Sequence, residues 1–66
     1  MRRGIIKSEL IKTIGHSGNT LEVEYADGKI FQYMGVPLKV FASIVRAKHP
    51  GRKLLEVRDQ YKFKEV

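Results

Sequence analysis

Residues 21–33 have the sequence LEVEYADGKIFQY, and this stretch decides the fold. Residues 21–25 alternate strictly between apolar and acidic side chains, which is the pattern of a β-strand with one buried face. Residues 29–33 form a second run with strand character, and the Asp27-Gly28 pair between the two runs is a typical hairpin turn. The stretch therefore predicts a β-hairpin.

The length of the hairpin loop decides which face Phe31 and Tyr33 occupy. A two-residue turn at Asp27-Gly28 would place both rings opposite the two glutamates of the first strand. A three-residue loop over residues 26–28, with Gly28 in the left-handed conformation and a β-bulge, would place them on the apolar face. We favour the three-residue loop, because it gathers five large side chains on one face of the hairpin. The other face would be hydrated and would carry Glu22, Glu24 and Gln32.

Two segments that flank the hairpin extend it into a sheet covered by a helix. Ser8–Ile14 is rich in β-branched residues and precedes a turn cluster at residues 15–19, so it predicts a third strand. Pro37 suits the first position of a helix, where its missing N–H costs nothing. We expect this helix to run from Pro37 to Lys48, with an apolar stripe of Val40, Phe41, Ile44 and Val45.

The C-terminal part of the chain predicts a shorter helix and a brief strand. His49-Pro50-Gly51 ends the main helix, because a proline there cannot continue the hydrogen-bond ladder. Beyond it, residues 61–64 alternate like a strand, and one face of a short helix would hold Leu54, Val57 and Tyr61. The predicted fold class is α+β: a small three- to four-stranded antiparallel meander, with its first three strands between Ser8 and Met34, packed against one main helix plus a short C-terminal helix.

Length and composition indicate one small domain. The 66 residues carry 13 Lys and Arg against 7 Asp and Glu, a net charge of +6, and include no cysteine. A chain this short has little room for a deep substrate pocket, and without cysteine it has no disulfides or thiol nucleophiles. We expect residues 1–66 to form a single domain with residues 1–4 as a flexible basic lead. No apolar run is long enough for a signal peptide or a membrane span, so we expect a cytoplasmic protein.

Candidate catalytic and metal-binding residues are few. His16 and His49 both lie in predicted turns, and neither has a carboxylate at a spacing that would fix two metal ligands on one element. Ser17, His16 and Asp59 could form a triad only if adjacent turn residues faced each other. We therefore expect no metal, no cofactor and no enzymatic activity.

The basic residues are distributed unevenly along the chain. No acidic residue occurs from Gly28 to Leu55, a stretch of twenty-eight residues with six Lys and Arg. Lys39 stands in the first helical turn, where it and the free N–H groups are suited to bind phosphate. The candidate nucleic-acid-binding surface of the helix and C-terminal segment comprises Lys39, Arg46, Arg52, Lys53 and Arg58. A solvated surface that only aids solubility explains the charge pattern equally well.

Aromatic side chains could add base stacking to this surface. Six aromatic residues in so small a domain are mostly required for the core. Tyr33 and Tyr61 are the two that we expect to keep a polar edge in water. Either ring could then stack on a base of single-stranded RNA.

The order of several short motifs resembles the KTSC domain family. These motifs are Ile14-Gly15-His16, the alternating strand at residues 21–25, Gly28, Phe31-Gln32-Tyr33, Gly35-Val36-Pro37, Gly51-Arg52 and Arg58-Asp59-Gln60-Tyr61. The resemblance runs from about Ser8 to Val66. The family includes the C-terminal domain of some lysyl-tRNA synthetases and small free-standing bacterial proteins, so the resemblance implies RNA binding. Residue by residue, it singles out Phe31, Tyr33, Gly51, Arg52, Arg58 and Tyr61.

Two functions follow as hypotheses. The first is a non-catalytic nucleic-acid-binding module, for RNA rather than DNA, in which the five cations contact phosphates and Tyr33 or Tyr61 stacks on a base. The second is a protein-interaction or homodimerisation module in which an unpaired edge strand, Ser8–Ile14, joins another chain.

Overall fold

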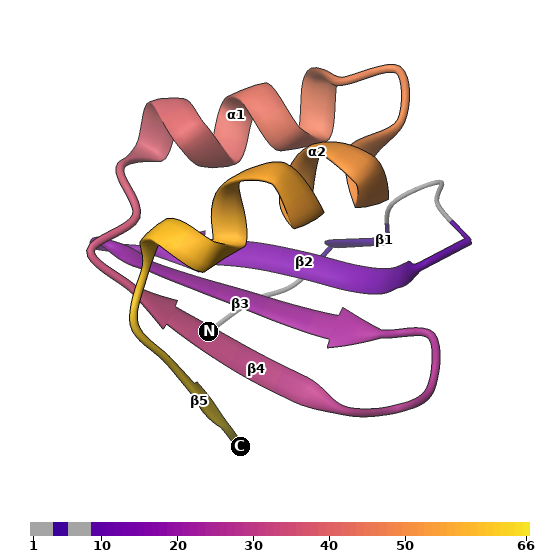
Figure 1. Ribbon diagram of the computed structural model, residues 1–66, viewed down its shortest axis with the longest axis horizontal. Coiled ribbons are helices and arrows are strands. Elements are labelled where there is room, and N and C mark those ends of the chain that lie inside the picture. The colour runs from indigo at the N-terminus through magenta and orange to yellow at the C-terminus, as the bar shows by residue number, and fades with distance from the viewer. Residues whose placement is uncertain (1–3, 6–8) are drawn as a thin grey trace.

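The sheet and the helices form two layers. The computed structural model describes residues 4–5 and 9–66. In it, five strands form one antiparallel sheet in sequence order, with two helices over one face (Figure 1), so the predicted α+β class is confirmed. The strands are β1 (Gly4–Ile5), β2 (Ile11–Ser17), β3 (Thr20–Tyr25), β4 (Ile30–Met34) and β5 (Phe63–Glu65). The helices are α1 (Leu38–Arg46) and α2 (Pro50–Val57), followed by the 3₁₀ turn η1 (Arg58–Gln60).

The register of β3 against β4 confirms the predicted hairpin. Leu21 lies opposite Tyr33, and Val23 lies opposite Phe31. Because side chains alternate between the two faces of a strand, all four point to the same face of the sheet. This is the face that the helices cover (Figure 1).

The loop between β3 and β4 has the predicted conformation. Gly28 has a φ of +93°, in the left-handed region. Its N–H donates to the Tyr25 carbonyl at 2.9 Å, and the Tyr25 N–H donates to the Lys29 carbonyl at 2.8 Å. These bonds close a three-residue loop over residues 26–28, so Gly28 supplies the bulge that sets the register.

β2 begins and ends later in the chain than predicted. The prediction placed a strand at Ser8–Ile14 and a turn directly after it, but β2 continues through His16, and the turn follows at Gly18, whose φ is +59°. The tertiary contacts of His16 explain the difference. Its Nε2 lies 2.7 Å from the Val36 carbonyl oxygen, and its ring stacks on Phe41 with the centroids 5.4 Å apart. The sequence positions that resemble a turn therefore form an ordered strand.

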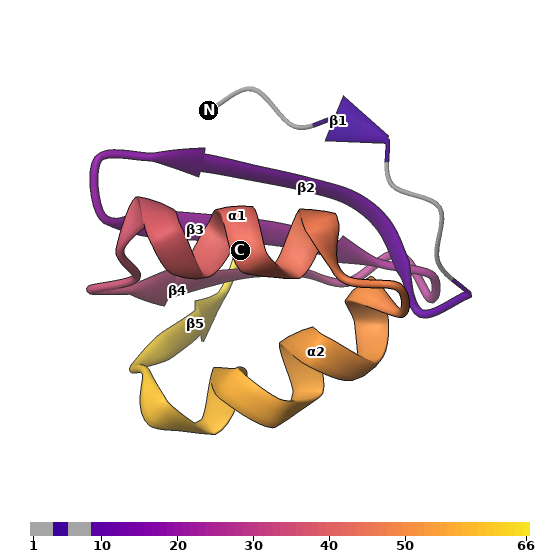
Figure 2. The same cartoon turned by 90° about the horizontal axis from the view of Figure 1, so that it is seen from above.

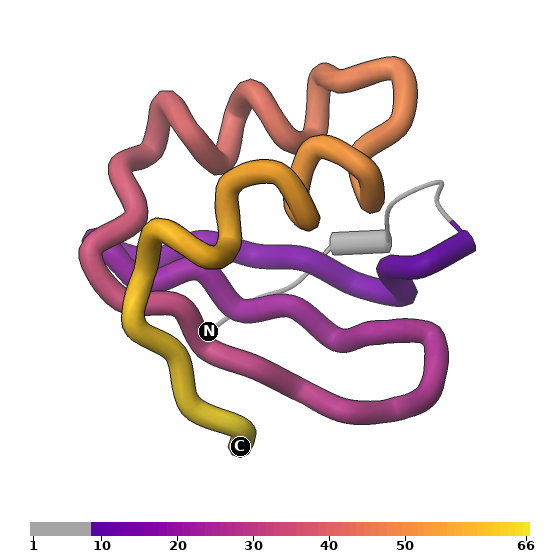
Figure 3. Tube along the Cα trace, in the orientation of Figure 1, coloured from indigo at the N-terminus to yellow at the C-terminus, as the bar shows by residue number. Residues whose placement is uncertain are grey.

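The connection from β4 to α1 is hydrogen-bonded to the β2–β3 turn. Both segments lie at the same end of the sheet (Figure 3). The Val36 N–H donates to the Asn19 carbonyl at 2.7 Å, and the Val36 side chain is fully buried. Gly35 has a φ of +73°, which allows the chain to leave the sheet at this point. The start of α1 is thereby fixed over the sheet.

α1 is shorter than predicted at both ends. Pro37 is its N-cap and has an extended conformation, and the helix ends at Arg46 instead of Lys48. Pro50 occupies the first turn of α2, where its missing N–H needs no partner. The His49-Pro50-Gly51 sequence therefore starts the second helix, and the first helix ends before reaching it.

The core lies between the sheet and the helices. Seen from above, α1 lies over the middle strands, and α2 lies on the side of β5 (Figure 2). Val45, which was predicted in the apolar stripe of α1, is exposed. Val40, Phe41, Val57 and Tyr61 are half-buried against the core. Its buried residues are Ile11, Ile14, Leu21, Val23, Tyr25, Tyr33, Val36, Ile44 and Leu54.

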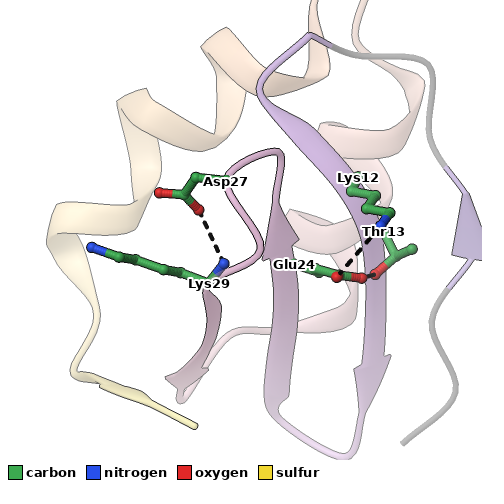
Figure 4. Close-up of polar contacts among 5 residues, drawn as sticks. All are labelled: Lys12, Thr13, Glu24, Asp27 and Lys29. Carbon is green, nitrogen blue, oxygen red and sulfur yellow. Dashed lines mark hydrogen bonds and ion pairs between the residues drawn. The ribbon is translucent and has the colours of Figure 1, made fainter.

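The opposite face of the sheet is polar. Glu22 is only 9% exposed and accepts a hydrogen bond from Nε2 of Gln32 at 2.9 Å. Glu24 accepts one from the Thr13 hydroxyl at 3.2 Å and lies 4.0 Å from the Lys12 ammonium (Figure 4). The prediction of a hydrated face is therefore wrong for Glu22, whose carboxylate is buried with a hydrogen-bond partner.

The edges of the sheet are β1 and β5. β1 pairs with β2, with Gly4 opposite Ile14, so the C-terminal end of the predicted strand Ser8–Ile14 is not an unpaired edge. The predicted flexible lead falls mainly on residues 1–3, which lie outside the described residues. In the described part of the chain, neither α1 nor α2 is long and apolar enough to span a membrane.

Gly28 provides a test of the loop. Gly28→Ala should lower the free energy of unfolding by about 1 kcal/mol, because an L-residue is disfavoured at positive φ. A Cβ at this position would meet no atom within 4 Å, so the expected loss is conformational and not steric. Gly28→Asn should lower the free energy of unfolding by less, because asparagine tolerates the left-handed region. Urea unfolding followed by circular dichroism measures both, and an alanine variant as stable as the parent protein would contradict this account of the loop.

Candidate nucleic-acid interface

Four of the predicted phosphate-binding residues lie on the two helices. Lys39 and Arg46 are exposed on α1 and, seven residues apart, lie on the same side of it. Arg52 is exposed in the first turn of α2, and Lys53 beside it is half-buried. Because α1 and α2 run in opposite directions (Figure 1), Lys39 lies at one end of this helix layer and the other three lie at the opposite end.

The cations of the helix layer lie outside ion-pair distance of the described carboxylates. Neither these four residues nor Arg58 forms an ion pair with a carboxylate of the described residues. Lys12 on β2 and Glu24 on β3 do form an ion pair. The positive charge of α1, α2 and η1 is therefore free to attract phosphate groups.

Arg58 is hydrogen-bonded to Tyr25, which in turn pairs with Tyr33. Its Nη1 lies 3.4 Å from the hydroxyl of Tyr25, which is hydrogen-bonded to the hydroxyl of Tyr33 at 2.6 Å. Both tyrosines are buried. Burial, and next the hydrogen bond with Tyr25, raises the pKa of Tyr33 well above its usual range. The bond to Tyr25 raises the pKa of Arg58, so the guanidinium stays charged at the end of α2.

The two predicted stacking residues differ in their accessibility. Tyr33 is 3% exposed, so the prediction that its edge stays in water is wrong: the ring packs in the core, and the hydroxyl is bonded to Tyr25. Tyr61 is half-buried against the core and keeps part of its surface exposed. Only Tyr61 of the two can contact a base without unfolding.

Phe63 is the exposed aromatic ring of the β4–β5 region. It lies opposite Tyr33 across the β4–β5 pair and is 61% exposed. Its ring centroid is 5.7 Å from that of Phe31 and 5.9 Å from that of Tyr33. Phe31 itself is half-buried and packs edge-on against Tyr25, with 5.6 Å between the centroids. These rings form one continuous aromatic surface that extends from the core to the solvent.

Arg58 and Phe31 line two neighbouring hollows, which we call together the Arg58 groove. One hollow, of about 330 Å³, is also lined by Tyr33, Asp59 and Phe63. The other, of about 460 Å³, is lined on its far side by residues of the hairpin loop that include Asp27 and Lys29. Asp27 accepts a hydrogen bond from the Lys29 N–H at 3.0 Å, and the Lys29 side chain leaves the loop (Figure 4). The groove thus combines an aromatic surface with two cations, Arg58 and Lys29, and two carboxylates, Asp27 and Asp59.

The remaining predicted cations lie outside this groove. Arg52 lines a separate hollow at the α1–α2 connection, together with Lys48, His49 and the acidic Glu9. Among the residues that the structure describes, no group of three His, Asp or Glu side chains could hold a metal ion. The structure therefore brings Arg58 together with Tyr33 and distributes the other predicted cations over the helix layer.

Three residues of the groove were not predicted as site residues: Phe63, Lys29 and Tyr25. A signal for Phe63 was present, because the alternation of residues 61–64 predicts a strand. A fourth strand beside β4 would place its apolar residue on the face of Tyr33. The contact of Tyr25 with Arg58 joins residues 33 positions apart, and no local pattern indicates it.

Comparisons with known proteins identify one family. The sequence pattern of the KTSC domain matches residues 7–61. The crystal structure of a KTSC domain protein from Yersinia pestis is similar to this chain, with a TM-score of 0.93 and 25% sequence identity, over 98% of this chain and 96% of that one. No curated protein matches the sequence significantly.

The tyrosine pair predicts a loss of stability at alkaline pH. The unfolded chain releases the Tyr33 proton near pH 10, whereas the folded chain retains it to higher pH. The unfolded state therefore binds fewer protons above about pH 10, and the free energy of unfolding should fall as the pH rises. For Tyr33→Phe, the free energy of unfolding should fall less steeply with pH. For Tyr61→Phe, which leaves the tyrosine pair intact, it should fall as steeply as for the parent protein. Urea unfolding at pH values from about 8 to 11 measures the slopes; equal slopes for all three proteins would refute this role of Tyr33.

Proposed function

The chain belongs to the KTSC domain family, and we propose that it is a non-catalytic, cytoplasmic module that binds single-stranded RNA. The observation that carries the proposal is the Arg58 groove, where an anchored guanidinium lies beside an exposed aromatic ring. Stacked bases and charged phosphates alternate along a single strand, so this pairing of groups fits one nucleotide and its phosphate.

Arg58 has the donors to bind a phosphate while it stays anchored. A guanidinium carries five N–H donors, and the bond to Tyr25 uses one of them. The others can form charge-assisted hydrogen bonds to phosphate oxygens, in the paired geometry that arginine favours. The anchor also limits the number of positions of the side chain, so less conformational entropy is lost on binding.

Phe63 and Phe31 supply the stacking surface. A base placed on the exposed Phe63 ring would extend the row of rings that begins with Tyr33. This contact needs an unpaired base, which a duplex does not offer, and it is available to every base type. Binding through these rings and through phosphates therefore requires a single strand and reads little sequence.

The cations of the helix layer extend the phosphate contacts beyond the groove. Asp27 and Asp59 border the groove and offset the charges of Lys29 and Arg58, so the groove alone attracts a polyanion only weakly. Lys39 lies at the same end of the helix layer as Arg58, and Arg46, Arg52 and Lys53 lie at the other end. We therefore assign most of the electrostatic attraction to the helices and the base contact to the groove.

The salt dependence of RNA binding tests the electrostatic part. Each phosphate contact to a single strand gives a slope near −0.7 in a plot of log affinity against log salt concentration. If five cations contact phosphates, the affinity for a short labelled single-stranded RNA should therefore fall about a hundredfold between about 50 and 200 mM salt. Fluorescence anisotropy measures this change. The double variant Arg52→Gln, Lys53→Gln should reduce the slope by about 1.4.

Lys12→Gln is the matched control, because it removes one positive charge from β2, outside the helix layer. It should leave the slope close to that of the parent protein. A duplex of the same RNA should bind more weakly, since its bases are paired. An absence of binding at about 50 mM salt would contradict the proposed function.

The Phe63 ring tests the stacking part. Phe63→Ala should weaken RNA binding by about 1–3 kcal/mol, whereas Phe63→Tyr should retain it. Leu38→Ala is the control, because Leu38 is also exposed and apolar but lies on α1, outside the groove. If Phe63→Ala and Leu38→Ala bind RNA equally well, the groove is not the base-binding site.

A further inference from the structure

β5 is an edge strand with a regular set of main-chain groups. It pairs with β4, and no other described strand lies beyond it (Figure 1). The Met34 N–H donates to the Lys62 carbonyl, and the Val66 N–H donates to the Ile30 carbonyl, each at 2.8 Å. In an antiparallel pair, alternate residues direct their main-chain groups to the same side. The even-numbered residues from 62 to 66 therefore face β4.

The main-chain N–H and C=O groups of Phe63 and Glu65 face outward. Both residues are exposed, and the register of the β4–β5 pair turns these groups away from β4, the strand on the other side. They lie two residues apart, so their spacing is that of an open sheet edge that another strand can join. The edge has the chemistry needed for β-strand addition.

The side chains around this edge differ between the two faces. Phe63 points to the helix side, where it packs near Tyr33. Lys62 and Lys64 alternate with it and point to the opposite face. Glu65 points to the same side as Phe63. A strand beside β5 would therefore place one set of its side chains against the Phe63 ring and the Glu65 carboxylate, and the other set against two ammonium groups.

The β5 edges of two copies of this chain do not fit each other in antiparallel pairing. Pairing two β5 strands antiparallel through Phe63 on both copies sets Lys64 opposite Lys62, and pairing Phe63 with Glu65 sets the two Lys64 residues opposite each other. Pairing Glu65 with itself sets two carboxylates opposite each other. Like charges directly across a strand pair are destabilising, so each arrangement opposes self-association.

We propose that the β5 edge binds an extended peptide segment of a partner protein in which acidic and apolar residues alternate. The peptide would hydrogen-bond to the main chain of Phe63 and Glu65. Its acidic side chains would lie beside Lys62 and Lys64, and an apolar side chain would lie beside the Phe63 ring. This inference goes beyond the proposed RNA binding and does not depend on it, because it rests on the main chain of β5.

A labelled peptide with the sequence Glu-Val-Glu-Phe-Glu, blocked at both ends, is the probe. Glu65→Pro removes one outward N–H and leaves the bonds to β4 in place, since proline is tolerated where the N–H of an edge strand faces solvent. It should weaken peptide binding at least about tenfold in fluorescence anisotropy. The matched control Glu65→Gln removes the same charge, keeps the N–H, and should bind the peptide at least as well as the parent protein.

Three further measurements complete the test. A peptide whose main-chain N–H groups facing β5 are methylated should bind at least about tenfold more weakly. This measurement uses the parent protein, so its result does not depend on the folding of any variant. Hydrogen exchange at the amides of Phe63 and Glu65 should slow when the peptide is added. RNA affinity should be the same for Glu65→Pro and Glu65→Gln, so a failure of this proposal is distinguishable from a failure of RNA binding.

Three results would overturn the proposal. The first is peptide binding that is unaffected by both Glu65→Pro and N-methylation. The second is equal binding of a peptide with lysine in place of each glutamate. The third is a dimer in light scattering whose Phe63 and Glu65 amides are protected without peptide, which would make a second copy the occupant of the edge.

Discussion

The left-handed conformation of Gly28 closes the loop between β3 and β4, and this loop fixes how the two strands pair. A slip by one residue would turn Phe31 and Tyr33 to the polar face of the sheet. In the observed register, the Tyr33 hydroxyl meets that of Tyr25 inside the core, and the pair anchors Arg58 at the end of α2. The Arg58 groove therefore depends on a turn of the chain far from Arg58 in the sequence.

The central hairpin was predictable because its signals are local. Strict alternation over residues 21–25, the glycine at position 28 and the need to bury Phe31 and Tyr33 together selected one register. The position of β2 was not predictable in the same way. Its residues after Ile14 resemble a turn, and the contacts that keep His16 in the strand come from Val36 and Phe41, which follow it by 20 or more positions.

The candidate site was only partly predictable for a similar reason. The sequence identifies Arg58 as a cation near the C-terminus and Tyr33 as a strand aromatic, but it does not show that a buried hydroxyl pair joins them. The same pair removes Tyr33 from the set of exposed rings. Phe63 takes its place because β5 adds to β4 with Phe63 opposite Tyr33, and this exposes Phe63 at the edge of the sheet.

Folding also separates the charges of a chain whose net charge is +6. Glu22 and Glu24 are hydrogen-bonded to polar residues of the sheet, whereas the cations of α1, α2 and η1 have no ion-pair partner in the described part of the chain. The helix side therefore carries cations without an ion-pair partner among the described residues, and Phe63 lies at its border with the sheet edge. Its ring belongs to the Arg58 groove, while its main chain belongs to the open edge of β5. A strand added at that edge would bring a side chain against the Phe63 ring and cover the surface on which a base would stack. Peptide and RNA would then exclude each other at this one residue, so the two proposed surfaces are coupled by geometry alone.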